Sequence, residues 1–320
     1  MSFIARSTPG SIERLQSSSF RVTSPIRPRE KVPPPSPNRF VAQDLAHVGH
    51  ALQGHHEERA REGNAAVRRS AALRALELDP NLSDVHSALA AVAFEDWDWE
   101  SADRAYRRAL ELNPDSINAC ACYGNSLAAW SRVSEAIEIN RHAERVNPLS
   151  PFGQFNYGFV LYVARRFDGA VPHFKRAIEL EPQYGPAYLL LSYAYAELGK
   201  TQEAVAVVDR PEFQGSATLG RALAQAGRRP EALAIAEGLH KRGVDPFGLA
   251  ALYFALGENA KGVERLTRAF DQRVGFVRWA NVDPAFDAVR SEPRFQALVS
   301  RLHLPQTRAV PAREARGPGP

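Results

Sequence analysis

Small and apolar residues recur along the middle of the chain with a period of 34 residues. Four similar segments each end in a proline, and these are Pro80, Pro114, Pro148 and Pro182. An alanine stands five positions before each proline, at Ala75, Ala109, Ala143 and Ala177. A second alanine stands twelve positions before the last three prolines, at Ala102, Ala136 and Ala170. Columns that keep one period indicate repeated helical hairpins, and each proline ends the second helix of its hairpin.

Close contact between the two helices of a hairpin explains the residue types in these columns. Gly or Ala where the helices cross lets the backbones approach, and a ring such as Tyr106 or Phe174 fills the space toward the next hairpin. Asn140 takes the place of this ring in the unit 117–150. The pattern therefore predicts three successive hairpins between residues 83 and 184.

The period loosens after Pro182. Residues 185–210 predict one more hairpin, whose second helix is cut short by Pro211. Turn sequences around Ala226-Gly227 and Leu256-Gly257 predict two shorter hairpins. The segment from Asp283 to Leu302 reads as a final amphipathic helix that caps the last hairpin, as a stacked array requires.

These columns resemble the tetratricopeptide-repeat (TPR) family, and the unit 151–184 resembles it most closely. Its matching residues are Tyr157-Gly158, Leu161, Ala170, Phe174, Ala177 and Pro182. The resemblance implies an all-α fold, in which antiparallel helix pairs wind into a right-handed α–α superhelix, the TPR solenoid.

Other phrases of the sequence are similar to one bacterial subgroup of TPR arrays. They are Asp96-Trp97-Asp98-Trp99, the closing segment Asp283 to Phe295, and Leu304-Pro305. Arrays of that subgroup form the C-terminal part of winged-helix transcription regulators, class III adenylate cyclases and serine/threonine kinases. The resemblance covers about residues 70–305 and implies regulatory duty beside an effector domain, for which residues 1–69 are too short and too polar.

The two ends of the chain differ in composition from its middle. Residues 1–40 hold seven Pro and eight Ser and few large apolar side chains, so we expect a disordered arm. Residues 41–64 begin with Val41, Leu45, Val48 and Leu52 at helical spacing, which predicts a short amphipathic helix or linker. We expect the repeat domain to occupy residues 65–305 and a disordered tail to occupy residues 306–320.

Composition narrows the possible functions. Apolar residues make up 44% and charged residues 24% of the chain, and the formal net charge is +4. Residues 71–305 carry 26 Lys or Arg against 29 Asp or Glu, so the repeat domain lacks the cationic surface of a nucleic-acid-binding protein. We expect no membrane span, because no apolar run approaches about 20 residues. The two cysteines, Cys120 and Cys122, fit a reducing compartment, and we expect a cytoplasmic protein.

Signatures of catalysis are missing from the sequence. It contains no phosphate-binding Gly-rich loop, no zinc-hydrolase His-Glu-x-x-His and no Gly-x-Ser-x-Gly. The acids around Asp96 could collect a divalent cation, but we interpret them as solvating a turn and favouring the start of the next helix. The histidines between His47 and His56 lack the further ligands of a zinc site. We therefore expect no enzyme, no cofactor and no bound metal.

The TPR resemblance also implies where a partner binds, because the first helices of such hairpins line the concave side. The candidate partner-binding residues are Phe94, Asn118, Asn125, Phe152, Phe155, Phe159, Tyr162, Leu189 and Tyr193. An aromatic strip suits an apolar or amphipathic peptide or protein. The alternative is that tight winding buries several of these rings between neighbouring helices.

Two functions remain open from the sequence. The first is a non-enzymatic scaffold that binds a protein or peptide partner in the groove. The second is the regulatory module of a bacterial signalling system, whose effector domain lies on another chain or has been lost. The sequence names neither the partner nor the oligomeric state.

Overall fold

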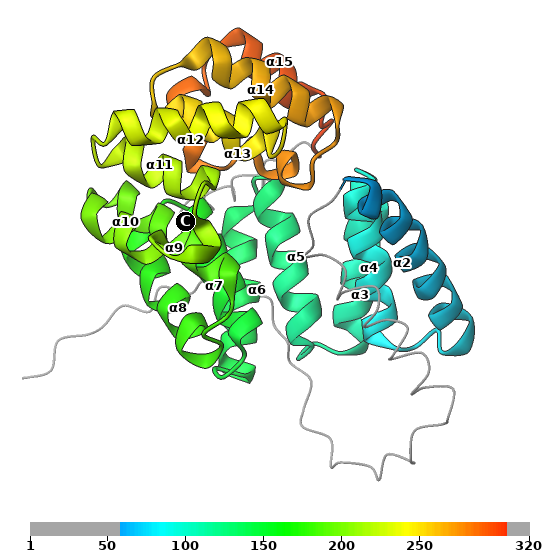
Figure 1. Ribbon diagram of the computed structural model, residues 1–320. Helices are drawn as coiled ribbons and strands as arrows, with labels where there is room; N and C mark the ends of the chain where they lie inside the picture. The colour runs from blue at the N-terminus through cyan, green and yellow to red at the C-terminus, as the bar shows by residue number, and fades with distance from the viewer. Residues whose placement is uncertain (1–57, 306–320) are drawn as a thin grey trace, which may run out of the picture. The chain divides into compact units, whose positions relative to one another are not determined.

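The computed structural model describes residues 58–305, and within that range every regular element is helical. The predicted all-α fold class is therefore confirmed. The predicted arm (1–40), most of the predicted helix or linker (41–64) and the tail (306–320) lie outside the described residues. Helix α2 (Glu58–Leu78) comes first, and consecutive helices after it pair side by side (Figure 1).

The helices follow the predicted hairpins closely. The three hairpins of period 34 are α3 (Ser83–Glu95) with α4 (Trp99–Leu112), α5 (Ile117–Ala129) with α6 (Val133–Val146), and α7 (Pro151–Val163) with α8 (Phe167–Leu180). The later ones are α9 (Gly185–Glu197) with α10 (Thr201–Val208), α11 (Ala217–Gln225) with α12 (Arg229–Arg242), and α13 (Pro246–Ala255) with α14 (Asn259–Asp271). A 3-10 turn, η2 (Pro211–Phe213), follows α10, so Pro211 shortens this hairpin as predicted.

Local side chains set where these helices begin and end. The Ser116 hydroxyl accepts a hydrogen bond from the Ala119 amide at 3.3 Å, and the Ser150 hydroxyl accepts one from Gly153 at 3.0 Å. Each satisfies an amide of a first helical turn that has no partner within the helix. Asn113, the residue before Pro114, takes an extended conformation with φ −146° and ψ 94°. The prolines therefore end the second helices for the predicted reason.

The helices of a hairpin contact each other through one small residue and one ring. A Cβ added at Gly158 would lie 2.7 Å from a ring carbon of Phe174, which is fully buried. In the hairpin α5–α6, Gly124 of α5 faces Asn140 of α6. The Asn140 amide group donates to the Ala136 carbonyl oxygen at 3.0 Å. Asn140 thus occupies the place of the ring and satisfies its donor within its own helix. Close backbone approach at these glycines fixes how the two helices of each hairpin pack.

The end of the chain differs from the prediction. The expected single helix from Asp283 to Leu302 is two pieces, η4 (Pro284–Val289) and α15 (Pro293–Ser300). Pro293 lacks an amide proton and places Glu292 in an extended conformation (ψ 132°), which breaks the helix. Phe295 and Leu302 are nevertheless buried with residues of α13 and α14, so this segment covers the last hairpin.

Replacing Gly158 by alanine tests the close contact. We expect the Gly158→Ala chain to lose about 1–3 kcal/mol of unfolding free energy, because the new methyl group overlaps the Phe174 ring. Gly169→Ala is the matched control, since its Cβ would meet only Leu161, at 3.7 Å, and alanine favours helices. Urea unfolding followed by circular dichroism measures both. Equal stability of the two variants would contradict the account.

Candidate functional site

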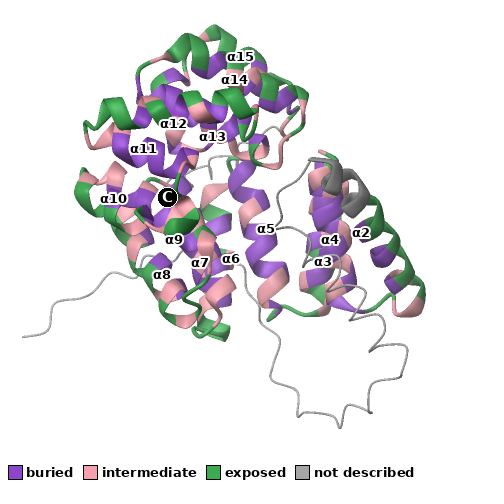
Figure 2. Ribbon diagram, viewed as in Figure 1, coloured by how far each residue is buried: buried purple, intermediate pink, exposed green. Residues whose placement is uncertain are grey.

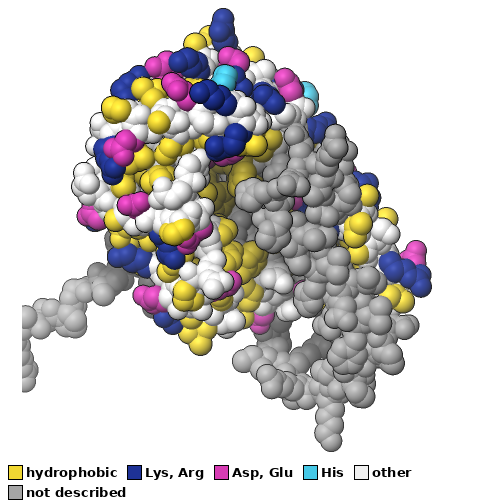
Figure 3. Space-filling view, in the orientation of Figure 1, with side chains coloured by type: hydrophobic (Ala, Val, Ile, Leu, Met, Phe, Trp, Pro, Cys, Tyr) yellow, Lys and Arg dark blue, Asp and Glu magenta, His cyan; other side chains and the backbone are white. Residues whose placement is uncertain are grey.

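The first helices α3, α5, α7 and α9 carry all nine candidate partner-binding residues. Four of them lie within the first five residues of their helices and are partly exposed: Asn118, Phe152, Phe155 and Leu189. We call these four residues the open half of the groove. The Phe155 ring lies edge-on to Tyr184, with the ring centres 5.3 Å apart. Figure 3 shows hydrophobic side chains gathered over the region of α7 and α9, with most charged side chains around them.

The other end of the same helices is covered by the chain itself. After α14 the chain forms a 3-10 turn, η3 (Gly275–Trp279), and continues through η4. We call residues 275–289 the C-terminal strap. Residues of the strap contact the last turn of α3, the C-terminal half of α7 and a backbone carbonyl oxygen of α5. These contacts join positions more than 100 residues apart in the sequence.

Trp279 is the central apolar contact of the strap. Its ring centre lies 5.7 Å from that of Phe94 and 5.8 Å from that of Phe159. Its indole N–H donates to the Asn125 carbonyl oxygen at 3.3 Å. Phe94, Asn125 and Phe159, three of the candidate residues, therefore contact the chain's own C-terminal segment, and Phe94 keeps only 6% of its surface exposed.

Polar contacts fix the strap further along α7. Arg165, in the turn after α7, donates to Asp287 at 2.5 and 3.2 Å and to the Val282 carbonyl oxygen at 2.6 Å. The Tyr162 hydroxyl, almost fully buried, lies 3.5 Å from an Asp283 carboxylate oxygen. Burial raises the pKa of Asp283, although Arg221 and Arg165 oppose that shift. Tyr162, a fourth candidate residue, thus also faces the strap.

The turns between paired helices show which hairpins meet the C-terminal segment. Each turn has one residue in the left-handed region, and in the last three such turns it is Gly199, Gly227 and Gly257. In the first three turns it is Trp97, Ser131 and Arg165, with φ of 66°, 62° and 58°. A side chain costs free energy in this region, so these three are unusual.

All three of these turn side chains contact the C-terminal part of the chain. Arg165 binds Asp287, the Ser131 hydroxyl lies 3.3 Å from the Asn281 amide nitrogen, and the Arg273 guanidinium lies 4.7 Å from the centre of the Trp97 ring. Non-glycine residues at three turn positions 34 residues apart were the sequence signal for this contact, and the sequence analysis missed it.

Tyr193, a fifth candidate residue, takes part in a buried polar group. The Arg221 guanidinium lies 4.1 Å from the centre of its ring, and its hydroxyl lies 3.4 Å from that of Thr218. Arg221 is 2% exposed and donates to Glu197 at 3.0 Å. Tyr193 therefore supports the packing of α9 on α11.

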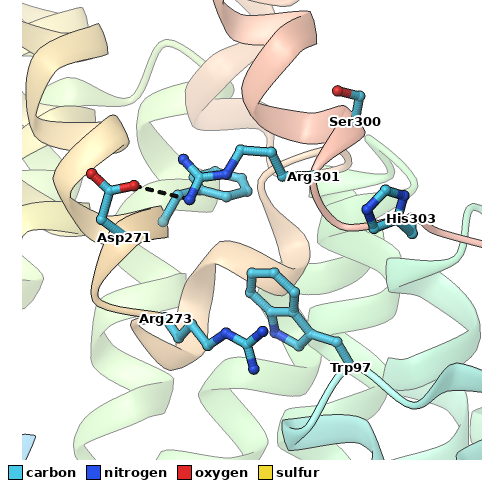
Figure 4. Close-up of a pocket in the computed structure, with 7 residues that line it drawn as sticks. Trp97, Asp271, Arg273, Ser300, Arg301 and His303 are labelled. Atoms are coloured by element: carbon cyan, nitrogen blue, oxygen red, sulfur yellow. Dashed lines mark hydrogen bonds and ion pairs between the residues drawn. The ribbon is translucent and has the colours of Figure 1, made fainter.

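A shallow depression of about 390 Å³ lies where the first turn meets the last hairpin (Figure 4). Trp97, Arg273, Asp271, Arg301 and His303 line it together with Phe270 and Ser300. Arg301 donates to Asp271 at 2.9 Å, and Arg273 lies against the Trp97 ring. Both arginines are thus already engaged with the protein.

The acidic residues around the start of α4 also pair with other side chains of the protein. Glu95 accepts hydrogen bonds from Arg68, Asp96 pairs with Arg69, and Glu100 pairs with Arg104. The Asp98 carboxylate accepts a hydrogen bond from the Ser101 amide at 3.1 Å and so begins α4. Within residues 58–305 no three His, Cys, Asp or Glu side chains lie close enough to hold a metal ion. The ion pairs of these acids and the capping bond of Asp98 agree with the interpretation that the acids support the turn and the start of α4.

Cys120 and Cys122 are both buried. Burial raises the pKa of each thiol to about 12, so both stay protonated near neutral pH. None of the helices between residues 58 and 305 has the length and apolar character needed to cross a bilayer.

Comparison with known proteins supports the TPR resemblance. Residues 162–215 match a family model described as a tetratricopeptide repeat. A small glutamine-rich tetratricopeptide repeat-containing protein 2 of Mycosarcoma maydis is 28% identical over 88 residues, which is 27% of this chain. Anaphase-promoting complex subunit 3 of Dictyostelium discoideum is 24% identical over 99 residues, or 31% of this chain. The chain spans only 24% and 10% of the lengths of these two relatives.

A solved structure supports the same fold. A tetratricopeptide repeat protein from Parabacteroides merdae superposes with a TM-score of 0.53 at 12% identity, covering 82% of this chain and 99% of that protein. Together with the helical pairs, this likeness confirms the predicted TPR solenoid. The similarity to one bacterial subgroup, with its regulators, cyclases and kinases, stays a prediction.

Removing the Trp279 ring tests the contact between strap and groove. We expect Trp279→Ala to lower the unfolding free energy by about 2 kcal/mol, because a half-buried ring and its contacts with Phe94 and Phe159 are lost. The control is Val244→Ala, since Val244 is 46% exposed, lies outside the strap and should matter by less than about 1 kcal/mol. Urea unfolding measures the two, and equal losses would refute the central place of Trp279.

The ion pair between Asp287 and Arg165 predicts a pH dependence. Burial raises the pKa of Asp287, but hydrogen bonds from Arg165 and Arg290 lower it more, and the net pKa lies below the usual value. A lowered pKa adds stability above the unfolded pKa of about 3.9, and that stability is lost as the pH falls through the folded value. The Asp287→Asn chain should therefore have a lower melting temperature than the parent chain at pH 6. The difference between the two melting temperatures should become smaller below about pH 4. A difference that stays constant would contradict this role.

Proposed function

We propose that this chain is a non-enzymatic scaffold that binds an apolar or amphipathic peptide or protein segment in the open half of the groove. TPR proteins generally mediate protein–protein interaction, and the match of residues 162–215 supports the same use here. The observation that carries the proposal is the partly exposed set Phe152, Phe155 and Leu189 beside Asn118. These residues lie on adjacent first helices, since α5 contacts α7 and α7 contacts α9.

The side chains of the open half suit an apolar ligand. Phe152 and Phe155 stand three residues apart on α7, so their rings lie on one face of the helix. Aromatic rings contribute large contact area and lose little rotamer freedom, which makes them frequent anchors of binding surfaces. Asn118 adds a polar group that can hydrogen-bond to a peptide backbone. An amphipathic helix with apolar residues at i, i+3 and i+4 has the matching chemistry.

Contacts with the strap reduce the number of candidate residues that we propose for partner binding. Phe94, Asn125, Phe159 and Tyr162 contact strap residues, and Tyr193 lies against Arg221. We propose that these five residues hold the groove in shape and that the partner contacts the other four. The regulatory role in a signalling system and the cytoplasmic location remain predictions from the sequence.

A peptide selection tests this function. We would select peptides that bind the purified full chain from a random phage-displayed library and measure their dissociation constants by fluorescence polarisation. We expect apolar residues at helical spacing in the selected peptides. Phe152→Ala combined with Leu189→Ala should weaken binding at least about tenfold, because two anchors at about 1 kcal/mol each are lost.

The control is Val244→Ala, which removes a 46% exposed apolar side chain from the turn before α13. This variant should bind as tightly as the parent chain. The proposal fails if the double variant also binds as tightly, or if binding depends only on the free carboxylate of the peptide.

A further inference from the structure

The depression beside Trp97 collects residues with an unfavourable backbone conformation. Trp97, Arg273 and His303 all line it, and their φ angles are 66°, 48° and 47°. A side chain in this left-handed region costs free energy that glycine avoids. Such residues persist where the side chain has a use, and they gather at ligand-binding sites. Contact with Arg273 accounts for Trp97, whereas no hydrogen bond, ion pair or ring contact within residues 58–305 involves the His303 side chain.

The arginines of the depression keep hydrogen-bond donors free despite their contacts with the protein. The Arg273 guanidinium lies 4.7 Å from the centre of the Trp97 ring and makes no hydrogen bond or ion pair within residues 58–305. Arg301 uses one amino group for Asp271, at 2.9 Å. That pair is weak, because the two side chains are 42% and 59% exposed and water competes for both. Each guanidinium carries several N–H groups, so most of these donors are available to a ligand.

The charge and position of the depression suit an anion that arrives from outside the array. Its lining holds two guanidinium groups and the His303 imidazole against one carboxylate, that of Asp271. In Figure 4 the side chains of Arg273, Arg301 and His303 surround the Trp97 ring. Helices α14 and α15 end at the depression, and their outer sides are exposed in Figure 2. A ligand therefore reaches these donors without entering the groove.

We propose that this depression binds a phosphate group carried by a serine or threonine of a partner protein. Arg273, Arg301 and His303 donate hydrogen bonds to the phosphate oxygens. Arginine is suited to this task, because its planar N–H groups match the spacing of phosphate oxygens. The phosphate replaces Asp271 as an acceptor for Arg301, since it carries about two negative charges at pH 7 and the carboxylate carries one.

Two other sources of phosphate fit the depression less well. A nucleic-acid backbone needs a row of cationic groups, and residues 71–305 carry 26 Lys or Arg against 29 Asp or Glu. A small free phosphate compound binds best in an enclosed pocket, whereas this depression is shallow and its charged side chains are exposed. A phosphate on a protein gains further contacts from the surface around it. The site shares no residue with the open half of the groove, so it does not depend on the function proposed there.

Retention of phosphopeptides by the immobilised full chain tests the site. The probes are two pools of short peptides, one with phosphoserine and one with serine between random residues. We expect the parent chain to retain the phosphoserine pool at least about tenfold better, because charge-assisted hydrogen bonds form only with the phosphate. Inorganic phosphate should displace this pool only at millimolar concentration.

Two variants of the depression should lose this preference. Arg273→Gln combined with Arg301→Gln should abolish it. His303→Ala should lower it about threefold, through the loss of one hydrogen bond, and removes no contact within residues 58–305 that the fold needs. The matched control is Arg145→Gln combined with Arg294→Gln, which removes the same charge from two exposed arginines outside the depression and should keep the full preference.

Three results would overturn the proposal. The first is equal retention of the two pools by the parent chain. The second is a preference that survives in full in either variant of the depression. The third is displacement of the phosphoserine pool by micromolar inorganic phosphate, which would assign the depression to a free anion and not to a partner protein.

Discussion

Close approach of two helix backbones at a small residue is the constraint on which the rest of this structure depends. Gly124 and Gly158 leave room for Asn140 and Phe174, and a methyl group at either glycine would overlap its partner. Because the same contact recurs 34 residues apart, the hairpins α5–α6 and α7–α8 share one internal geometry and can stack in the same way. The C-terminal segment thereby comes to lie against the first helices.

The strap shows a second use of the same period. A left-handed turn residue is least costly as glycine, and the hairpins from α9 onward use glycine there. Trp97, Ser131 and Arg165 adopt the left-handed conformation although it is less favourable for them than for glycine. Each of these side chains contacts the segment between Arg273 and Asp287. The strap therefore covers the C-terminal part of these first helices and leaves their N-terminal part accessible. Their last turns face the strap, and their first turns keep Phe152, Phe155 and Leu189 accessible.

The sequence predicted the hairpins well because their causes are local. Alanine columns, capping serines and closing prolines act within a few residues, and each helix of the period appears where expected. The strap escaped prediction because Trp279 meets Phe94 and Asn125 across more than 150 positions, and no short-range pattern records such a contact. The prediction of one last helix was wrong for a local reason. The apolar spacing of Phe295, Leu298 and Leu302 suggested a continuous helix, but Pro293 holds Glu292 in an extended conformation and breaks it. The candidate residues were placed on the correct helices, but their position along each helix decided which of them face the strap.

The central claim is that the strap lies against α5 and α7 in the free protein and leaves the first turns of these helices open. Hydrogen–deuterium exchange of the unmodified full chain, read by mass spectrometry, tests it most directly. The account predicts that amides of residues 276–289 with hydrogen bonds, such as Ala280 and Val282, exchange as slowly as those at the end of α7. Exchange of this segment at the rate of an unfolded peptide, while α7 stays protected, would contradict it.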